Sequence, residues 1–417
     1  MKNKNDDLIV GIDIGSSKII VVISEIDDTG NISIIGVGKA DSKNGIKGGV
    51  IINIESVVSA INEALEVAEI QAGREVKSVF VGFSAGNIET INSKGIVAIS
   101  GVDKEIREID INRVIDAAKA VAIPMDKEIL HIIPQGFTVD GQAGIKYPIG
   151  MVGTRLECQI HILTSPISSI QNVLKCMDRA GLEIRDIVLQ NLSAGRACLA
   201  EDEKELGVLL LDFGAETVKA SVYYQQAPFY NAIYPLGGYL ITNDLAMGLK
   251  IPFATAEKLK VAFGVTHYGY VDEEETVQIP TVGGRSPKLL ARVNLIHIIK
   301  PRVEEILNIV KEDLKEKGFF DKISGGIVLT GGTSMLPGIV DVCQEVFDIQ
   351  TRLGVPHKFS GLGDQLNSPE YSVANGLVLW GYERVNKTTD MATRGKKDDG
   401  NKRGFLKVIK NFFDDLF

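Results

Sequence analysis

The sequence is poor in cysteine and in long apolar runs, and both shortages exclude classes of protein. Its 417 residues include four cysteines, which are far apart and form no Cys-x-x-Cys pair. This spacing argues against a thiolate metal site or a disulfide framework, so we expect buried free thiols in a reducing cytosol. No run of about 18 apolar residues occurs, so we expect no membrane-spanning helix. The cysteines are Cys158, Cys176, Cys198 and Cys343.

The chain has fewer basic than acidic residues, and aromatic residues are few. The formal net charge is −9, which argues against a nucleic-acid partner because no global positive field attracts a phosphate backbone. Aromatic residues make up 6% of a chain that is 45% hydrophobic, a balance typical of α/β proteins with aliphatic sheets. The polar first residues show no signal-peptide pattern. The length leaves room for two or more domains.

The stretch from Leu8 to Glu25 carries the first motif. Two apolar segments flank a polar turn that begins at Asp13, a pattern that predicts a β-hairpin. A glycine with positive φ lets consecutive backbone N–H groups converge on an anion such as a phosphate. Asp13 is placed to hold a divalent cation through water, although an ordinary Gly-Ser turn without a ligand is the alternative. The predicted phosphate-binding residues of this turn are Gly15, Ser16, Ser17 and Lys18.

A second copy of this pattern occurs at Gly207–Tyr224. An apolar strand again ends in an aspartate, Asp212, and a glycine turn leads into a returning strand. A repeat about half a chain away predicts two similar domains that face each other across a cleft. Two such turns can hold a polyphosphate from both sides, and Asp13 and Asp212 can then share one Mg²⁺ through water. The predicted nucleotide-binding residues here are Gly214, Ala215, Glu216 and Thr217.

A third glycine turn lies within Gly325–Ile339, between a short apolar strand and a helix. Two adjacent glycines let a base or ribose approach the backbone closely. The three turns, in this order, resemble those of the actin/sugar-kinase/heat-shock-chaperone superfamily. The resemblance implies a two-lobed α/β fold that binds ATP between two phosphate turns and an adenosine turn. The adenosine turn contributes Gly331, Gly332, Thr333 and Met335.

Residues 84–163 change in character and are predicted to form an inserted strand–helix–strand subdomain. Strand patterns at 87–100, 128–139 and 155–163 surround a helix at 111–121, and Pro134 is expected at an edge or bulge. The run from His131 to Leu163 resembles the FtsA family of bacterial cell-division proteins, and the resemblance extends from Leu8 to about Tyr382. It implies an adaptor that binds ATP, polymerises, and tethers FtsZ filaments to the inner face of the cytoplasmic membrane at the division site.

Further site residues follow from the same resemblance. Gln190, in the first segment connecting the two halves, matches a residue that directs water at a γ-phosphate, but a solvated or capping glutamine is the alternative. Glu257 and Lys260 match residues that flank the adenosine and lie on one side of a helix, with a surface ion pair as the alternative. Arg302 and Glu305 match a region that binds the FtsZ tail, against the default of a solvated helix face. Other division proteins are expected to bind through residues 84–163.

The end of the chain combines a connector, a linker and an amphipathic segment. Residues 370–383 form a helix rich in small side chains, which match the second connecting segment and permit a close helix crossing at a hinge. Residues 384–403 are polar and are predicted to form a flexible linker. Residues 404–417 carry one continuous apolar stripe at helical spacing, which predicts a membrane-binding helix, with docking on the protein's own body or a partner groove as the alternative. The stripe is Phe405, Leu406, Val408, Ile409, Phe412, Phe413, Leu416 and Phe417.

These motifs divide the chain into subdomains. Residues 1–83 and 164–198 are expected to form the first core subdomain, and residues 199–240 and 301–383 the second. Residues 241–300 are expected to form a smaller subdomain over the nucleotide, which begins with a helix start at 242–244. The lone tryptophan, Trp380, is expected to pack in the core.

Two other functions fit the same superfamily. A sugar or small-molecule kinase would need a catalytic base that the sequence does not reveal, and a pilus-assembly relative would bind a peptide at the insert. The second turn departs from the usual run of glycines, because Ala215 tolerates positive φ poorly and Glu216 brings negative charge. We therefore expect ATP binding with slow or negligible hydrolysis, which leaves the status of the protein as an enzyme open.

Overall fold

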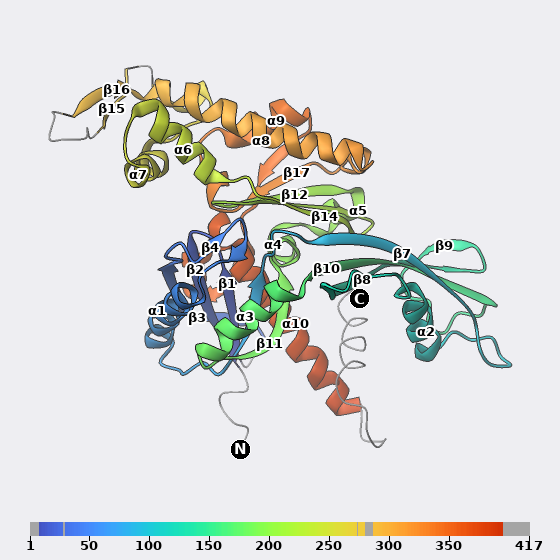
Figure 1. The fold of residues 1–417 in the computed structure, drawn as a ribbon. Helices are drawn as coiled ribbons and strands as arrows, with labels where there is room; N and C mark the ends of the chain where they lie inside the picture. The colour runs from blue at the N-terminus through green and yellow to red at the C-terminus, as the bar shows by residue number, and fades with distance from the viewer. Residues whose placement is uncertain (1–7, 28–29, 273, 280–286, 395–417) are drawn as a thin grey trace.

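The computed structural model describes residues 8–27, 30–272, 274–279 and 287–394 of the chain, and Figure 1 shows them as a ribbon. Two halves, each built on a mixed sheet, lie one above the other, and an elongated insert projects from one side. The predicted amphipathic segment, 404–417, lies outside the described residues. Within the described part of the chain, no helix has the length and apolar character needed to cross a bilayer.

The first half is built on a sheet with the strand order β11-β6-β1-β2-β3-β19. Strands β1, β2 and β3 are antiparallel neighbours, whereas β6 and β11 run parallel to β1. The first hairpin is therefore real, and its register places Asp13 opposite Ile20. The strands are β1 (Leu8–Ile14), β2 (Lys18–Ile26), β3 (Ile32–Asp41), β6 (Ser78–Phe83), β11 (Glu183–Leu189) and β19 (Ser360–Gly361), beside a small β4 (Ile46–Lys47) and β5 (Val50–Ile51) hairpin.

The second half repeats this arrangement in the order β14-β13-β12-β17-β18. Strands β12, β13 and β14 are antiparallel, and β17 and β18 run parallel to β12. The two sheets therefore share one topology, which explains the repeat seen in the sequence, and the second hairpin places Asp212 opposite Lys219. The strands are β12 (Val208–Phe213), β13 (Val218–Tyr224), β14 (Ala227–Tyr234), β17 (Ile327–Thr330) and β18 (Thr351–Leu353).

Helices cover both sheets on their outer faces and fill the space between them. Helices α1 (Ile54–Ala72) and α3 (Ile167–Arg179) pack on the outer face of the first sheet. Helices α8 (Ile296–Glu316) and α9 (Ile339–Phe347) pack on the outer face of the second sheet. Helices α4 (Gln190–Cys198) and α10 (Ser372–Arg394) lie between the sheets, in a core that combines residues of both halves and includes Trp380 as expected. Helix α5 (Glu201–Leu206) follows α4.

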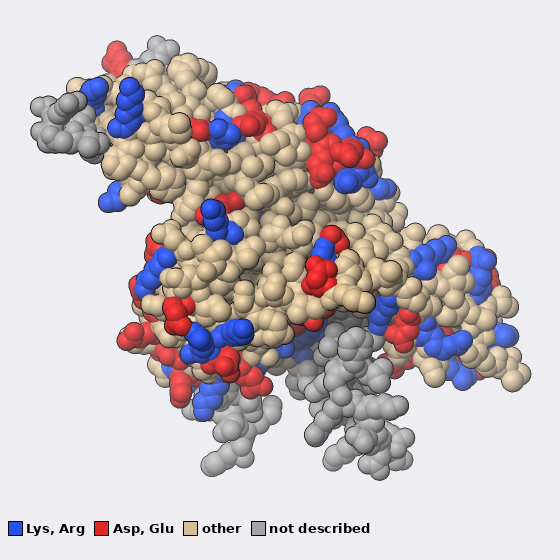
Figure 2. Space-filling model, in the orientation of Figure 1, with Lys and Arg blue, Asp and Glu red and all other residues tan. Residues whose placement is uncertain are grey.

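The insert has an antiparallel sheet of its own, in the order β7-β10-β8-β9, with one helix packed on it. Pro134 lies beside a register shift between β8 and β10, which agrees with the predicted bulge. Figure 2 shows acidic and basic side chains mixed over this part of the molecule. The elements are β7 (Glu89–Ala98), α2 (Glu108–Ala118), β8 (Lys127–Val139), β9 (Gln142–Ile145) and β10 (Arg155–Pro166).

A small helical unit caps the second half. Helices α6 (Gly238–Leu249) and α7 (Phe253–Phe263) pack together, and the two-stranded sheet β15 (Thr276–Ile279) and β16 (Lys288–Ala291) projects beyond them. The predicted helix start at 242–244 was wrong, because α6 begins at Gly238. Short 3-10 turns complete the fold, namely η1 (Tyr268–Tyr270), η2 (Arg292–Leu295), η3 (Phe320–Lys322), η4 (Gly332–Met335), η5 (Leu362–Leu366) and η6 (Pro369–Tyr371).

Helix α10 extends beyond the predicted connector. It begins at Ser372 and continues to Arg394, so that it includes the first part of the range expected as linker. The four cysteines are buried and free, as expected from their spacing. Burial raises the pKa of Cys158 to about 12 and that of Cys176 to about 11, so both thiols are protonated at neutral pH.

Candidate functional site

A cleft of about 440 Å³ lies between the two halves, and the three glycine turns line it. The first two turns are closed in the same way, because the amide of Gly15 donates to the carbonyl of Lys18 at 3.1 Å and that of Gly214 to Thr217 at 2.9 Å. The predicted second copy is therefore a structural copy, and the two turns meet at one cavity. Their remaining backbone and hydroxyl groups offer hydrogen bonds to an anion in that cavity.

The glycines serve a different purpose from the one expected. None of the residues Gly15, Gly214 and Ala215 has a positive φ. The left-handed conformation expected in these turns was therefore wrong. The backbone strain expected at Ala215 was wrong for the same reason. The turns need glycine because the chain doubles back closely. A Cβ at Gly15 would lie 2.7 Å from the carbonyl oxygen of Lys18, and one at Gly214 would lie 3.1 Å from that of Thr217.

Asp13 lies at the end of β1 and is 8% exposed. Gln190, the first residue of α4, donates from its side-chain amide to Asp13 Oδ1 at 2.6 Å and to the Ile14 carbonyl at 3.1 Å. Gln190 is 2% exposed, so the alternative of a solvated glutamine was wrong. Burial raises the pKa of Asp13 to about 7; the Lys219 ammonium opposes this shift, and the Asp212 carboxylate adds to it. The Asp13 carboxyl therefore keeps its proton to a higher pH than an exposed aspartate does.

Asp212 has a partner that the sequence analysis missed. Lys219, directly across the hairpin on β13, places its Nζ 2.8 Å from Asp212 Oδ2, and both side chains are less than one-tenth exposed. The signal was present in the sequence, because residues at equal distances from a hairpin turn lie opposite each other on one face. The carboxylate of Asp212 is thereby neutralised inside the protein.

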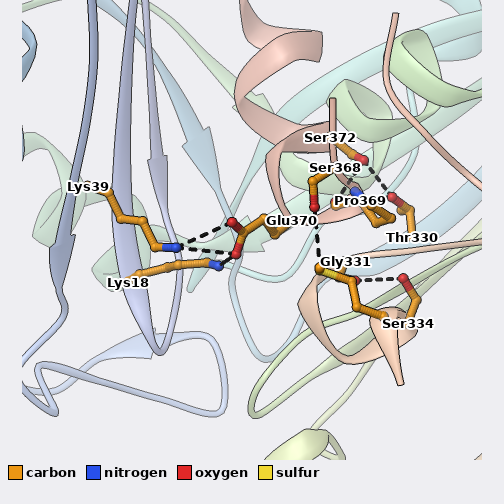
Figure 3. Close-up of polar contacts among 10 residues, drawn as sticks. Lys18, Lys39, Thr330, Gly331, Ser334, Ser368, Pro369, Glu370 and Ser372 are labelled. Atoms are coloured by element: carbon orange, nitrogen blue, oxygen red, sulfur yellow. Dashed lines mark hydrogen bonds and ion pairs between the residues drawn. The ribbon is translucent and has the colours of Figure 1, made fainter. Parts of the chain in front are cut away.

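Lys18 also has an internal counter-ion. Its ammonium contacts Glu370, which is 352 positions away in the sequence and lies in η6, just before α10. Figure 3 shows Lys18 and Lys39 both reaching this carboxylate, with Lys39 at 3.3 Å. Burial lowers the pKa of Lys18 despite the carboxylate. Burial would raise the pKa of Glu370, but Lys18 and Lys39 outweigh it and hold that pKa below its usual value. Glu370 was not predicted, since nothing in the sequence places it beside the first hairpin.

The third turn connects the second half to the segment before α10. Gly331 has a φ of +86°, which favours glycine, and its amide donates to the Pro369 carbonyl at 3.2 Å. Thr333 Oγ1 donates to the Gly214 carbonyl at 2.9 Å, which joins this turn to the second hairpin turn. A Cβ at Gly332 would meet nothing within 4 Å, so this residue faces open space. The turn therefore leaves open space beside Gly332 on the wall of the cleft.

Glu257 and Lys260 lie one turn apart on α7 and face the cleft together. Lys260 is 5% exposed, so the alternative of a surface ion pair was wrong for this residue. Its Nζ lies 2.8 Å from Glu257 Oε2 and 2.8 Å from Thr242 Oγ1, and it donates to the Gly238 carbonyl at 3.0 Å. Burial lowers the pKa of Lys260, and Glu257 offsets part of that effect. The pair fixes α6 against α7 at the edge of the cleft.

Glu216 is the one predicted nucleotide-binding residue that does not line the cleft. Its Oε2 accepts a hydrogen bond of 2.6 Å from the amide of Gly48, so this carboxylate joins the second turn to the first half. A negative charge of Glu216 beside bound phosphates stays a prediction. The structure brings the other predicted residues to the cavity wall, namely Asp13, Gly15, Ser16, Ser17, Lys18, Gln190, Asp212, Gly214, Ala215, Thr217, Glu257, Lys260, Gly331, Gly332, Thr333 and Met335.

Arg302 and Glu305 lie elsewhere, on α8. Arg302 binds Asp244 of α6 through two nitrogens and also contacts Glu305. The side chain of Glu305 is 55% exposed and that of Arg302 is 29% exposed. Arg302 therefore fixes α6 on α8, while Glu305 faces solvent.

The repeated sheet topology and the shared interdomain cleft define an actin-like protein with an extra subdomain inserted in its first half. A family model described as "SHS2 domain inserted in FTSA" matches residues 85–164, one residue away from the predicted 84–163, and one described as "Cell division protein FtsA" matches residues 209–376. The chain is 39% identical to cell division protein FtsA of Pseudomonas aeruginosa over 97% of both chains. It is 41% identical to FtsA of Borreliella burgdorferi over 94% of this chain and 95% of that one. The chain belongs to the FtsA family of cell division proteins.

Solved structures show the same fold at low sequence identity. MreB5 of Spiroplasma citri bound to ADP matches with a TM-score of 0.56 at 12% identity, over 94% of this chain and 100% of that one. The PilM–PilN type IV pilus biogenesis complex matches with a TM-score of 0.63 at 16% identity, over 90% of this chain and 98% of that one. Membership of the FtsA family favours a division protein over the kinase and pilus-assembly alternatives.

Proposed function

We propose that this protein is an ATP-binding, actin-like adaptor that polymerises and tethers FtsZ filaments to the inner face of the cytoplasmic membrane at the division site. One observation supports nucleotide binding. Two hairpin turns closed by the same hydrogen bond and a third turn with two glycines all line one cleft. Membership of the FtsA family supports the proposed polymerisation and FtsZ partner. The membrane part rests on the apolar stripe in residues 404–417.

Each region of the cleft suits a different part of the nucleotide. The two hairpin turns supply backbone N–H groups, hydroxyls and lysines, which suit a polyphosphate. The third turn has no side chain at Gly331 or Gly332, and it lies close to the aliphatic and charged surface of α7, which suits a ribose and a base. Slow or negligible turnover is proposed because Gln190, the residue expected to direct water, has its amide committed to Asp13.

A bulky residue at Gly332 tests the nucleotide site. Its Cβ would enter open space on the cleft wall, so Gly332→Val blocks the ligand without disturbing the packing. We expect affinity for a fluorescent ATP analogue to fall by about tenfold or more. Gly136→Val is the matched control, because a Cβ there also meets nothing within 4 Å and Gly136 does not line this cleft. Equal loss in both variants, or no loss at Gly332, contradicts the assignment.

The terminal stripe has enough apolar surface to bind a bilayer. Full burial of one large apolar side chain is worth roughly 1.5–3 kcal/mol, and each nearby lysine or arginine adds about 1 kcal/mol on an anionic surface. Partial burial of the eight residues of the stripe therefore outweighs the cost of ordering a short helix.

Vesicle sedimentation tests the tether and its partner together. With anionic vesicles and FtsZ filaments, we expect the full chain to carry FtsZ into the pellet, because one end holds lipid and the body holds FtsZ. The double variant Phe412→Ser, Phe413→Ser should lose this recruitment. The control Asp414→Ser, Asp415→Ser changes only the polar face and should keep it. Recruitment by the phenylalanine variant would refute a tether made by the stripe, and no recruitment by the full chain would refute the adaptor role.

A further inference from the structure

The two hairpins that face the cleft are copies in backbone but differ at one buried position. Asp13 pairs across its hairpin with Ile20, and Asp212 pairs across its hairpin with Lys219. Directly opposed residues point to the same face of a sheet. Ile20 is fully buried in the core between the two sheets, whereas Lys219 lines the cleft. Lys219 thus puts a positive charge beside the second turn, at a position where the first hairpin has the apolar residue Ile20.

Lys219 is well held. Its Nζ lies 2.8 Å from Asp212 Oδ2, and a Cβ at Gly214 would lie 3.8 Å from the same nitrogen, so the ammonium stands beside the second turn. The side chain is 8% exposed, and lysine is seldom buried without a structural or functional reason. An ammonium group has three hydrogens to donate, of which Asp212 takes one. The other two are available to oxygens within the cleft.

This arrangement does not suit the magnesium site that the sequence predicted. A cation shared through water by Asp13 and Asp212 needs two carboxylates with free negative charge. Asp212 is already paired with Lys219, and Asp13 Oδ1 already accepts a hydrogen bond of 2.6 Å from the side-chain amide of Gln190. Among the described residues, no group of three or more His, Cys, Asp or Glu side chains is arranged to hold a metal ion. The cleft therefore offers the ammonium of Lys219 at the place where a magnesium site would need a free carboxylate.

We propose that the Lys219 ammonium takes the place of a divalent cation, so that the cleft binds nucleoside polyphosphates without Mg²⁺. This inference rests on the proposed nucleotide function and specifies the charge that neutralises the phosphates. Lys219 approaches the phosphate chain from the second hairpin, and Lys18 approaches it from the first. Each ammonium is already paired with a carboxylate, Lys219 with Asp212 and Lys18 with Glu370, and its remaining N–H groups are the donors that a phosphate would meet in place of a metal ion.

Binding of a fluorescent ATP analogue to the full chain, in excess magnesium and in excess EDTA, tests this proposal. We expect the two affinities of the unaltered protein to agree within about threefold. In Lys219→Asn, which removes the ammonium and frees Asp212, we expect binding in EDTA to fall by about tenfold or more and magnesium to restore part of it. Lys219→Arg keeps a cation at this position and should keep metal-independent binding. Lys315→Asn removes the same charge from an exposed pair on α8 and should change nothing.

The outcomes separate the two proposals. If the unaltered protein binds in magnesium and loses about tenfold or more in EDTA, Lys219 does not replace the ion, although the nucleotide function stands. If it binds in neither condition, both proposals fail. Should Lys219→Asn fail to fold by circular dichroism, the EDTA comparison on the unaltered protein and on Lys219→Arg still decides the question, because metal-dependent binding in either one overturns the inference.

Discussion

At the scale of single residues, the charged side chains that line the cleft are paired with other side chains of the protein. Lys18 binds Glu370, Lys219 binds Asp212, and Asp13 is held by the amide of Gln190. Under the proposed function, phosphates that enter would compete with these carboxylates for the lysines, since a desolvated cation cannot be left without a partner at low cost. The affinity for a nucleotide would then depend on an exchange of partners as well as on the number of contacts.

Asp13 makes stability depend on pH in a defined direction. Its pKa rises from 3.8 to about 7 on folding, so the folded protein binds the proton more tightly than the unfolded chain. The resulting stabilisation is fully present below about pH 4 and is lost as pH rises through about 7. Since one pKa unit corresponds to about 1.36 kcal/mol, we expect an effect on the order of 2–4 kcal/mol. Lys219, Asp212, Gln190 and Lys18 all influence this group.

The variant Asp13→Asn isolates this contribution. Urea denaturation of both proteins at pH 5 and pH 8 gives the free energy of unfolding in each condition. The unaltered protein should lose more stability than Asp13→Asn between these values, because asparagine has no proton to release. Parallel losses in the two proteins would show that Asp13 is not responsible.

The sequence revealed some of these residues and concealed others. Asp13, Gly15, Asp212 and Gly214 were predictable, because an aspartate and a glycine at the end of an apolar strand form a local pattern that occurs twice. Lys219 required the register of the second hairpin, which assigns the residue opposite Asp212. Glu370 could not be found, because its contact with Lys18 spans 352 positions and no local pattern records it.

At the scale of elements, the third turn has one glycine where neighbouring atoms leave no room for a side chain and another that faces open space. Gly331 has a φ of +86°, and a Cβ there would lie 2.3 Å from Asp212 Oδ1. We expect Gly331→Ala to reduce the free energy of unfolding by about 1–3 kcal/mol, from backbone strain and the displacement of Asp212. Gly332→Ala meets nothing within 4 Å and should stay within about 0.5 kcal/mol. Chemical denaturation of both variants checks this, and equal effects would refute it.

Helix α6 shows why one element boundary was missed. Its first amides donate to the second hairpin turn, from Gly238 to the Gly214 carbonyl at 3.0 Å and from Tyr239 to the Ala215 carbonyl at 2.7 Å. The helix therefore begins without a side-chain cap, and the polar residues at 242–244, which resemble a cap in the sequence, lie within its second turn. Helix starts that are capped by a distant segment leave no local signal.

At the scale of the whole molecule, the two halves are joined by the crossing of α4 and α10. The small residues of α10 were predicted to permit a close crossing, and the structure agrees, because a Cβ at Gly376 would lie 1.8 Å from the Ser193 carbonyl oxygen. Ser193 Oγ also donates to the Val373 carbonyl at 2.7 Å. The backbones therefore touch directly, and the spacing of the halves is fixed at this point.

The variant Gly376→Ala tests that crossing. Alanine is the better helix former by about 1 kcal/mol, so on propensity alone it would stabilise α10. We expect the opposite, a loss of roughly 1–3 kcal/mol in the free energy of unfolding, because the methyl group separates the two helices. Gly136→Ala, where a Cβ meets nothing within 4 Å, is the control in thermal or urea unfolding. A stabilised Gly376→Ala protein would show that the crossing is loose.

The first sheet is completed by residues that follow its first three strands by more than 300 positions, between 360 and 377, and this has a consequence for its synthesis. Strand β19 pairs with β3, Leu377 of α10 packs against Gly11 of β1, and Glu370 neutralises Lys18. At about 5–20 residues per second, a ribosome needs on the order of 20–70 seconds to travel from the first hairpin to these partners. Until then β1 has no α10 to pack against at Gly11, and Lys18 has no Glu370 to pair with. The half that is translated first is thus among the last parts of the molecule to complete its fold.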